Sequence, residues 1–198
     1  IFGNALVQVP GGRVADRFGP RMVITVGGLF WSVFTVRTAC VPAGLGYSFA
    51  MMILVRGLVG AGEAVVYPAS SRLVADWIPT SERGVANGFG LSGAGFGSAI
   101  TAPLITFLML NLGWKWSFHI SALIGVAAGI LWYLVARNKP RTHPYISAEE
   151  LQKIEAGIPA PVKKTDKQGV LPWGVIIRDK QVILLSLSYY TFAYAVYI

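Results

Sequence analysis

The sequence is poor in charged residues and in cysteine. Charged residues make up 13% of its 198 residues, about half the share found in a typical soluble domain. The single cysteine, Cys40, excludes an internal disulfide and a cysteine-based metal site within this chain. The sequence also lacks a phosphate-binding loop, a cluster of metal ligands and a Ser/His/Asp set at usable spacing. We therefore expect neither an enzyme nor a bound cofactor.

Apolar residues make up 54% of the chain and gather in long runs. A helix needs about 20 apolar residues to cross a bilayer, and only helices satisfy their own backbone polar groups there. The sequence therefore predicts an all-α polytopic membrane protein embedded in lipid. The chain opens inside a shorter run, 1–9, so we expect it to be a fragment of a longer protein. The expected spans are 22–41, 50–75, 84–110, 117–136 and the beginning of another at 182–198.

The basic residues lie in alternate loops. The net charge of +8 could suggest nucleic acid, but this alternation is the pattern that orients helices in membranes, so we expect no nucleic-acid partner. The positive-inside rule predicts that loops 10–21, 76–83 and 137–180 are cytoplasmic. The opposite side carries only Arg37 and Lys115. We expect a plasma membrane protein, specifically of the bacterial inner membrane.

Two charges interrupt the run 50–75, where a membrane helix should carry none. Arg56 and Glu63 are seven residues apart, which brings them within about 20° of each other on one helix face. A charge at bilayer depth costs at least ~2.5–3.5 kcal/mol, so the two should face a polar cavity or protein partners. A functional role for Arg56 and Glu63 is the preferred interpretation, because intramembrane charges usually mark a substrate or ion path. A buried structural ion pair is the alternative.

Other polar residues have two readings each. Asn4 and Gln8 are one turn apart and could touch a substrate or join two helices by hydrogen bonds. Tyr67 follows Glu63 by about one turn and could line the same path or serve in packing. His119 lies near the end of its span, where a structural or surface role is favoured over proton relay.

Several local signals predict turns, caps and close helix contacts. We expect a glycine- and arginine-rich turn at 11–21, a short turn at 113–116, and a helix from Ser147 through Ala156 opened by a capping box with Glu150. Thr80 or Ser81 could cap the helix that follows. The many small residues of 84–110 should allow tight packing, with a bend at Pro103. Further predictions are a flexible basic linker at 159–167 and a surface helix at 172–180.

The turn Gly-Arg-Val-Ala-Asp-Arg-Phe-Gly-Pro-Arg, residues 12–21, resembles the signature loop between the second and third helices of the major facilitator superfamily. The family usually has a basic residue where Pro20 stands, and Arg21 is the candidate to replace it. The resemblance assigns a conformational gate to residues of this turn, namely Gly12, Asp16, Arg17, Gly19 and Arg21.

A second stretch is similar to the fourth helix and following loop of the anion:cation symporter family. It runs Arg56-x3-Gly60-x-Gly62-Glu63-Ala64, Tyr67-Pro68-Ala69, Arg72-x3-Asp76-Trp77-x-Pro79 and Glu82-Arg83. The resemblance adds Asp76, Glu82 and Arg83 to the gate. It implies twelve helices in two bundles, of which this chain covers helices two through seven. The expected domains are a first bundle at 1–136, a cytoplasmic linker at 137–180 and the start of the second bundle at 181–198.

The resemblance further implies secondary import of a small organic anion, such as a sugar acid, in symport with protons by alternating access. Arg56 would bind the carboxylate, with Tyr67, Asn4 and Gln8 as further contacts, and Glu63 would carry the proton. Some sugar-acid carriers have a polar residue where Ala94 stands. We expect a monomer without cofactor, with sodium as the alternative coupling ion. Rival readings are a uniporter or antiporter in which Glu63 is structural, and a transport-dead sensor or scaffold.

Overall fold

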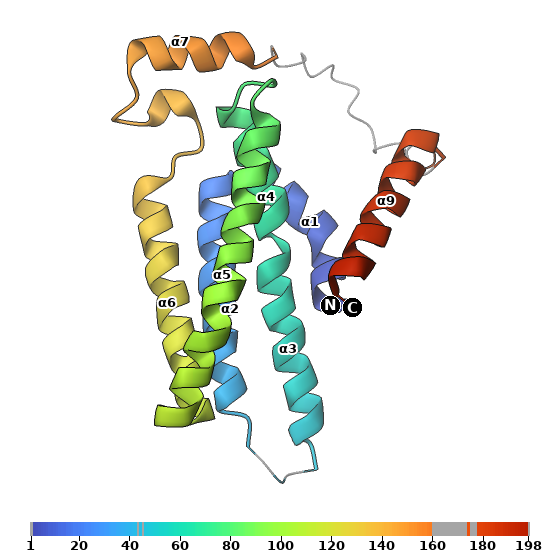
Figure 1. Ribbon diagram of the computed structural model, residues 1–198, viewed down its shortest axis with the longest axis vertical. Helices are drawn as coiled ribbons and strands as arrows, with labels where there is room; N and C mark the ends of the chain where they lie inside the picture. Colours follow the sequence, from blue (N-terminus) through green and yellow to red (C-terminus); the bar gives the residue numbers. More distant parts are fainter. Residues whose placement is uncertain (1, 43, 45, 160–173, 175–177, 198) are drawn as a thin grey trace. The chain divides into compact units, whose positions relative to one another are not determined.

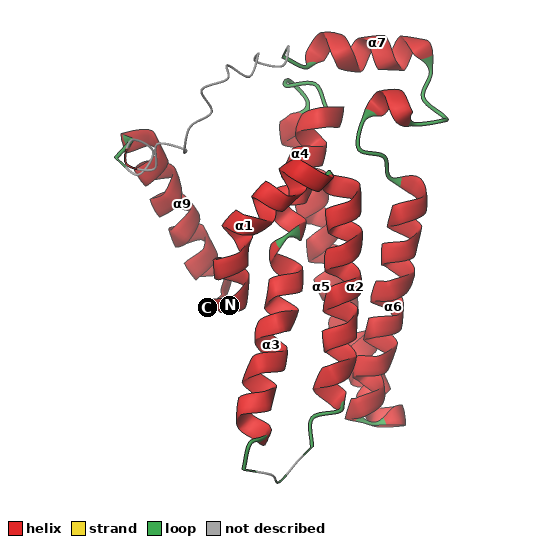
Figure 2. Cartoon of the chain, turned by 180° about the vertical axis from the view of Figure 1, so that it is seen from behind, coloured by secondary structure: helices red, strands yellow, loops and turns green. Residues whose placement is uncertain are grey.

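The computed structural model describes residues 2–42, 44, 46–159, 174 and 178–197, without the side chains of 2–6, 9, 189 and 192–197. The chain divides into two units, 1–159 and 160–198. The first unit holds eight described helical elements (Figures 1 and 2): α1 Phe2–Phe18, α2 Pro20–Ala39, α3 Ser48–Ala64, α4 Val66–Trp77, α5 Arg83–Leu112, α6 Trp114–Val135, the short 3-10 helix η1 Pro140–Thr142, and α7 Ala148–Gly157. The second unit contains α9, Lys180–Tyr197.

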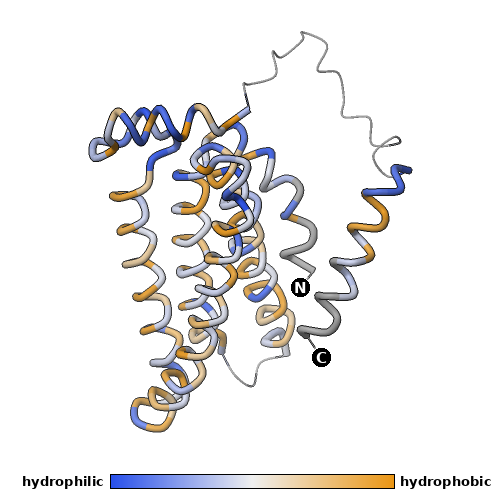
Figure 3. Tube along the Cα trace, turned by 45° about the horizontal axis from the view of Figure 1, so that its top comes forward, coloured by the Kyte–Doolittle hydropathy of each residue, from blue (hydrophilic) through white to orange (hydrophobic). Residues whose placement is uncertain are grey.

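The predicted all-α class is confirmed. Four stretches in the described part of the chain are long and apolar enough to cross a membrane: Pro20–Ala39, Ser48–Trp77, Arg83–Leu112 and Trp114–Val135. Apolar residues run along these helices, whereas in α7, at one end of the first unit, strongly hydrophilic residues alternate with apolar ones (Figure 3). The four stretches match the four complete spans predicted from the sequence to within three residues at each end.

The turn predicted at 11–21 is wrong for most of its length. The helix α1 continues through Gly11 and Gly12 to Phe18, and a single residue, Gly19 with φ of 84°, reverses the chain. A Cβ on Gly11 would lie 2.8 Å from the side chain of Val65, so this glycine allows close helix packing. Pro20 then occupies the first turn of α2, where its missing N–H costs nothing.

The charged stretch 50–75 is one span made of two helices. The helix α3 ends at Ala64, Val65 forms the junction, and α4 begins at Val66. Pro68 explains the interruption, because it has no N–H to donate to the Ala64 carbonyl and its ring crowds that carbonyl.

The helix α2 packs between α3 and α6. Its backbone approaches α3 at two glycines: a Cβ on Gly27 would lie 3.0 Å from the Gly62 carbonyl oxygen, and a Cβ on Gly62 would lie 3.0 Å from the Trp31 nitrogen. On the other side, a Cβ on Gly125 of α6 would collide with Trp31 and Ser32. Small residues thus bring three helices into close contact, as expected where van der Waals packing drives association.

The tight packing predicted for 84–110 is not found among the described residues. A Cβ added at five glycines of α5 would meet nothing within 4 Å: Gly88, Gly90, Gly93, Gly95 and Gly97. The helix instead buries Leu108 in its second half and runs without interruption through Pro103. The turn predicted at 113–116 is shorter than expected, because Gly113 with φ of 86° reverses the chain alone and α6 begins at Trp114.

The capping box that opens α7 is confirmed on its Ser147 side, since Ser147 Oγ accepts a hydrogen bond from the Glu150 N–H at 3.1 Å. The cap predicted for Thr80 or Ser81 is wrong. Glu82 precedes α5 without a side-chain cap, and the Thr80 hydroxyl donates instead to the Gly157 carbonyl at the end of α7, 3.3 Å away. The predicted linker at 159–167 and surface helix at 172–180 fall largely outside the described residues.

Candidate functional site

The first unit contains a cavity of about 500 Å³ between α2, α3, α5 and α6. Both intramembrane charged residues, Arg56 and Glu63, line this cavity. Their seven-residue spacing therefore does bring both side chains to the same cavity, as predicted from the helical period. The cavity reaches the turn between α5 and α6, because Trp114 belongs to its wall. The lining residues are Trp31, Thr35, Arg56, Val59, Glu63, Ile105, Met109, Trp114, Ser117, Phe118 and Ser121.

Glu63 is bonded to a residue that sequence reasoning missed. The indole N–H of Trp31 on α2 donates to Glu63 Oε1 at 3.0 Å. Trp31 is a donor only, so it suits a carboxylate oxygen. In the sequence Trp31 is one more apolar residue of a membrane span, and no motif marks it. Only the close approach of α2 and α3 at Gly27 and Gly62 brings the two side chains together.

Arg56 forms no ion pair with Glu63, although the side chains of both residues are described. The ion pairs found among the described residues join other side chains. Its guanidinium lies 5.5 Å from the centre of the Phe118 ring on α6, a cation–π arrangement. An aromatic face leaves the N–H donors of the guanidinium available. Arg56 therefore presents a positive charge and a two-pronged donor to the cavity.

Tyr67 and Gln8, the other predicted binding residues with described side chains, are not among the residues that line this cavity. Tyr67 lies beyond the kink on α4 and is 60% exposed. Gln8 is exposed on α1, and the side chain of Asn4 lies outside the described residues. Ala94 borders a different depression, formed by one face of α5. His119 is bonded within its own helix, with Nδ1 2.7 Å from the Lys115 carbonyl oxygen.

Several predicted gate residues meet at the opposite end of the bundle. Arg72 on α4 is bound on two sides, by Asp16 of α1 at 3.2 Å and by Asp76 at 3.0 Å. The first contact joins two helices, while the second lies within one. Arg72 stands in the motif quoted above but is not one of the predicted gate residues. Its pairing with Asp16 is visible only once α1 and α4 are packed together.

Arg21 fastens the start of α2 to the end of α6. Its Nε and Nη2 atoms donate to the Tyr133 carbonyl at 2.9 and 2.6 Å, and its guanidinium lies 4.1 Å from the centre of the Tyr133 ring. Its backbone N–H donates to Asn138 Oδ1 at 2.9 Å. A Cβ at Gly19 would collide with the same Asn138 side chain. These contacts attach the start of α2 to the end of α6 and to the segment that follows it.

The remaining gate candidates have more local roles in the structure. Arg83 donates to the carbonyls of Ala75 and Ile78 at 2.9 and 3.2 Å, and so satisfies the end of α4. Glu82 lies 3.9 Å from Lys153 of α7, and both side chains are exposed. Arg17 stacks on the neighbouring Phe18, 5.5 Å from its ring centre. Gly12 faces Pro68, where a Cβ would make ordinary contact at 3.6 Å.

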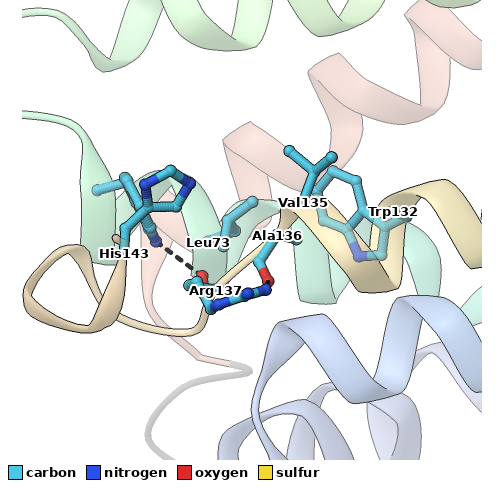
Figure 4. Close-up of a pocket in the computed structure, with 7 residues that line it drawn as sticks. Leu73, Trp132, Val135, Ala136, Arg137 and His143 are labelled. Atoms are coloured by element: carbon cyan, nitrogen blue, oxygen red, sulfur yellow. Dashed lines mark hydrogen bonds between the residues drawn. The ribbon is translucent and has the colours of Figure 1, made fainter. Parts of the chain in front are cut away.

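A smaller, mostly apolar pocket of about 230 Å³ lies at this same end (Figure 4). Its wall includes Leu73 of α4, Trp132 of α6 and His143 of the segment that follows. Trp77 donates its indole N–H to the Arg137 carbonyl at 3.1 Å and meets the His143 ring edge-on at 5.6 Å. The segment after α6 is thus attached to α4. No group of three or more metal-ligating side chains occurs among the described residues.

Comparison with known proteins agrees with this architecture. The profile of the Major Facilitator Superfamily matches residues 1–198. The chain is 36% identical over 159 residues to a probable galactarate/D-glucarate transporter of Bacillus subtilis, covering 79% of this chain and 35% of that protein. It is 38% identical over 150 residues to a probable galactarate/D-glucarate transporter of Escherichia coli, covering 75% and 34%. A probable sulfoacetate transporter of Cupriavidus necator is 33% identical over 150 residues, covering 76% and 34%.

The chain thus spans about a third of the length of the relatives it matches, and these relatives are named as transporters, not enzymes. Four stretches of membrane-spanning length among the described residues accompany the match over the whole sequence. The chain is part of an integral membrane protein and belongs to the Major Facilitator Superfamily.

Proposed function

We propose that the protein containing this chain imports a small organic anion, such as a sugar acid, together with protons by alternating access. The observation that carries the proposal is the cavity in which Arg56 and Glu63 both lie without pairing with each other. Similarity to probable transporters of galactarate, D-glucarate and sulfoacetate, all anions, supports the substrate class. The expected orientation places the end of the bundle with Asp16, Arg72 and Asp76 in the cytoplasm.

Arg56 is the proposed binding group for the anion. Its guanidinium rests on an aromatic ring instead of a carboxylate, so an incoming carboxylate does not have to displace an existing ion pair. The planar fork of arginine matches a carboxylate with two parallel hydrogen bonds. In a partly desolvated cavity this interaction is stronger than in water. Binding of the anion at Arg56 is therefore the first step of the proposed cycle.

Glu63 is the proposed coupling group. It shares the cavity with Arg56 and is held by a single neutral donor, Trp31. When charged, Glu63 adds a negative charge to a space that must also take an anion. Protonation would remove this repulsion and allow the loaded carrier to reorient. The membrane potential contributes about 2.3 kcal/mol for each net charge moved through 100 mV.

The hydrogen bond from Trp31 also favours a second candidate. It joins α2 to α3 at 3.0 Å, and such a bond could serve packing alone. Glu63 would then be structural, and the protein would be a uniporter or antiporter of the same fold. The two candidates differ in whether a proton gradient drives accumulation.

The test uses the full-length protein in proteoliposomes with D-glucarate and an imposed pH gradient. Glu63→Gln imitates the protonated form, so proton-driven accumulation should vanish while exchange of labelled for unlabelled substrate persists. Glu149→Gln removes an exposed carboxylate on α7 and should leave both activities intact. Accumulation by the Glu63→Gln variant at the wild-type level would reject Glu63 as the coupling site. Loss of exchange together with accumulation would favour the structural role.

A further inference from the structure

We propose that Trp31 on α2 is a positioning residue that keeps the Glu63 carboxylate from pairing with Arg56, and so leaves Arg56 free to bind the anion. The inference rests on the proposed function, because it concerns how the same cavity is kept ready for its ligand. It gives the bond between Trp31 and Glu63 a role in binding that neither the motifs nor the comparisons assign.

Each of the two charged side chains of the cavity is held by an aromatic residue of another helix. The indole N–H of Trp31 donates to Glu63 Oε1 at 3.0 Å. The Arg56 guanidinium lies 5.5 Å from the centre of the Phe118 ring on α6. Neither charge has an ionic partner among the described residues. Two opposite charges thus line one cavity without neutralising each other.

We expect these two charges to approach each other unless one of them is restrained. They are seven residues apart on α3, which is about 10.5 Å along the helix axis and about 20° around it. Both side chains are long, and both lead into the same cavity. The attraction between opposite charges is stronger in a partly desolvated cavity than in water. An ion pair between them would occupy the guanidinium donors that an incoming carboxylate needs.

The indole of Trp31 is fixed by the packing of α2 between α3 and α6. A Cβ on Gly62 would lie 3.0 Å from the Trp31 backbone nitrogen, so α2 and α3 meet closely at this point. A Cβ on Gly125 of α6 would lie 2.5 Å from Cζ3 and 3.1 Å from Cε3 of the indole. These two carbons belong to the edge of the ring system opposite the N–H. One edge of the ring therefore packs against α6 while the other holds Glu63.

The chemistry of the indole suits a restraint on a carboxylate. Its N–H donates and cannot accept, so it holds an oxygen of Glu63 and offers nothing to the guanidinium of Arg56. The ring is also neutral, so it restrains Glu63 without cancelling the charge that the proposed cycle protonates. Trp31 thus acts on the anion through Glu63 and Arg56.

Equilibrium binding of D-glucarate to the purified full-length protein tests the inference, at a mildly alkaline pH that favours a charged carboxylate. Trp31→Phe keeps an aromatic ring but removes the N–H donor. It should weaken binding about tenfold, because Glu63 then competes for Arg56. In the Glu63→Gln background no carboxylate competes, so adding Trp31→Phe should change binding by less than about twofold.

A second replacement of Trp31 separates the N–H from the shape of the ring. Benzothienylalanine has sulfur in place of the indole N–H and keeps the two fused rings that pack against Gly125. It should reproduce the results of Trp31→Phe in both backgrounds. Because its shape is nearly that of tryptophan, it serves as the test if the smaller phenylalanine ring disturbs folding.

Trp132→Phe is the matched control. It removes an indole N–H of α6 that has no partner among the described residues, and Trp132 is not one of the residues that line the cavity. D-glucarate binding should not change. Equal losses from Trp31→Phe in both backgrounds would show that Trp31 acts by packing or by touching the ligand. That result, or unchanged or tighter binding in the native background, would overturn the inference and leave the proposed function intact. Failure of the wild-type protein to bind any organic anion would instead refute the proposed function itself.

Discussion

Arg56 shows how the surroundings of one residue decide what its charge can do. It lies against Phe118 and not against Glu63, so its guanidinium is held in place without being neutralised. A lysine at this position would keep the charge but lose the planar fork. The arginine is therefore suited to recognise the shape of a carboxylate as well as its charge.

At Arg56, substitution by lysine separates charge from geometry. Arg56→Lys in the full-length protein should reduce anion uptake at least about tenfold, because the two-pronged contact with the carboxylate is lost. Membrane insertion and folding should survive. Uptake of D-glucarate into proteoliposomes gives the measurement, with Arg37→Lys, an exposed arginine outside the cavity, as the control. Wild-type uptake in the Arg56→Lys variant would make Arg56 a simple structural cation.

At the scale of helices, the contact between Asp16, Arg72 and Asp76 joins α1 to α4. The side chains of Asp16 and Arg72 are 63% and 48% exposed, and exposed ion pairs contribute only about 0–1 kcal/mol. Such a weak bond is a poor source of stability. It is better suited to a contact that must break and form again during each conformational change.

Asp16→Asn removes the charge from this contact without touching the cavity. We expect slower turnover, with little change in substrate affinity and a loss of stability of at most about 1 kcal/mol. Transport rates and equilibrium binding of the full-length protein separate the two effects. Asp179→Asn, beside α9 and outside this contact, is the control. A steep fall in affinity with unchanged exchange between conformations would contradict the gate assignment.

Another ion pair connects α7 to η1. Arg141 of η1 holds Glu155 of α7 with two hydrogen bonds. The hydrogen bond from Arg141 lowers the pKa of Glu155 below its ordinary value, with a further contribution from the charge of Arg141. Since the folded pKa lies below the unfolded one, the contact stabilises this segment above the unfolded pKa. The stabilisation is lost as the pH falls through the folded pKa.

Hydrogen exchange of the α7 amides as a function of pH tests this dependence. After correction for the intrinsic exchange rate, protection should hold at neutral pH and decline below the ordinary glutamate pKa of about 4.3. Glu155→Gln should show reduced protection at neutral pH and less dependence on acid. Glu149→Gln, on the same helix, should behave like the wild type. An identical pH dependence in the wild type and Glu155→Gln would show that Arg141 does not control the docking of α7.

Within the first unit, the described residues of the three predicted basic loops, 10–21, 76–83 and 137–159, meet at one end. Arg72 binds Asp16, Arg21 binds Asn138, and Thr80 binds Gly157. The charge asymmetry of the sequence thus corresponds to a difference between the two ends of the first unit, one of which carries the predicted basic loops. The positive-inside rule assigns this end to the cytoplasm.

Cysteine labelling in intact cells tests the orientation. With Cys40 and any other native cysteine replaced, a cysteine at Gln152 should react only with reagent that reaches the cytoplasm. A cysteine at Gly46 should react with impermeant reagent added outside. Both positions are exposed, so access to the residue should not limit the reaction. Reversed labelling would reject the predicted topology.

The sequence by itself was sufficient for the helical class and the membrane spans. Apolar length is a property of the chain alone, and the bilayer requires each long apolar run to satisfy its backbone as a helix. The spacing of Arg56 and Glu63 was likewise sufficient to place both on one cavity, because helical periodicity is local. The Ser147 cap was predictable for the same reason, since its partner is three residues away.

Local signals failed where packing between distant segments decided the outcome. The glycines at 11 and 12 were expected to turn the chain, but α1 passes through them and Gly11 packs closely against Val65. Gly19 alone reverses the chain. A glycine permits a turn and a close helix contact equally well, and only the neighbouring helix determines which of the two occurs.

The partners of the charged and polar residues came from the tertiary structure alone. Trp31 reaches Glu63, and Phe118 underlies Arg56. These residues belong to α2, α3 and α6, which are separated along the chain and follow no shared sequence pattern. Apolar length and helical period are encoded within each segment. The identity of a neighbour across a helix interface depends on how closely and in what register two helices pack, and that is settled only when the bundle forms.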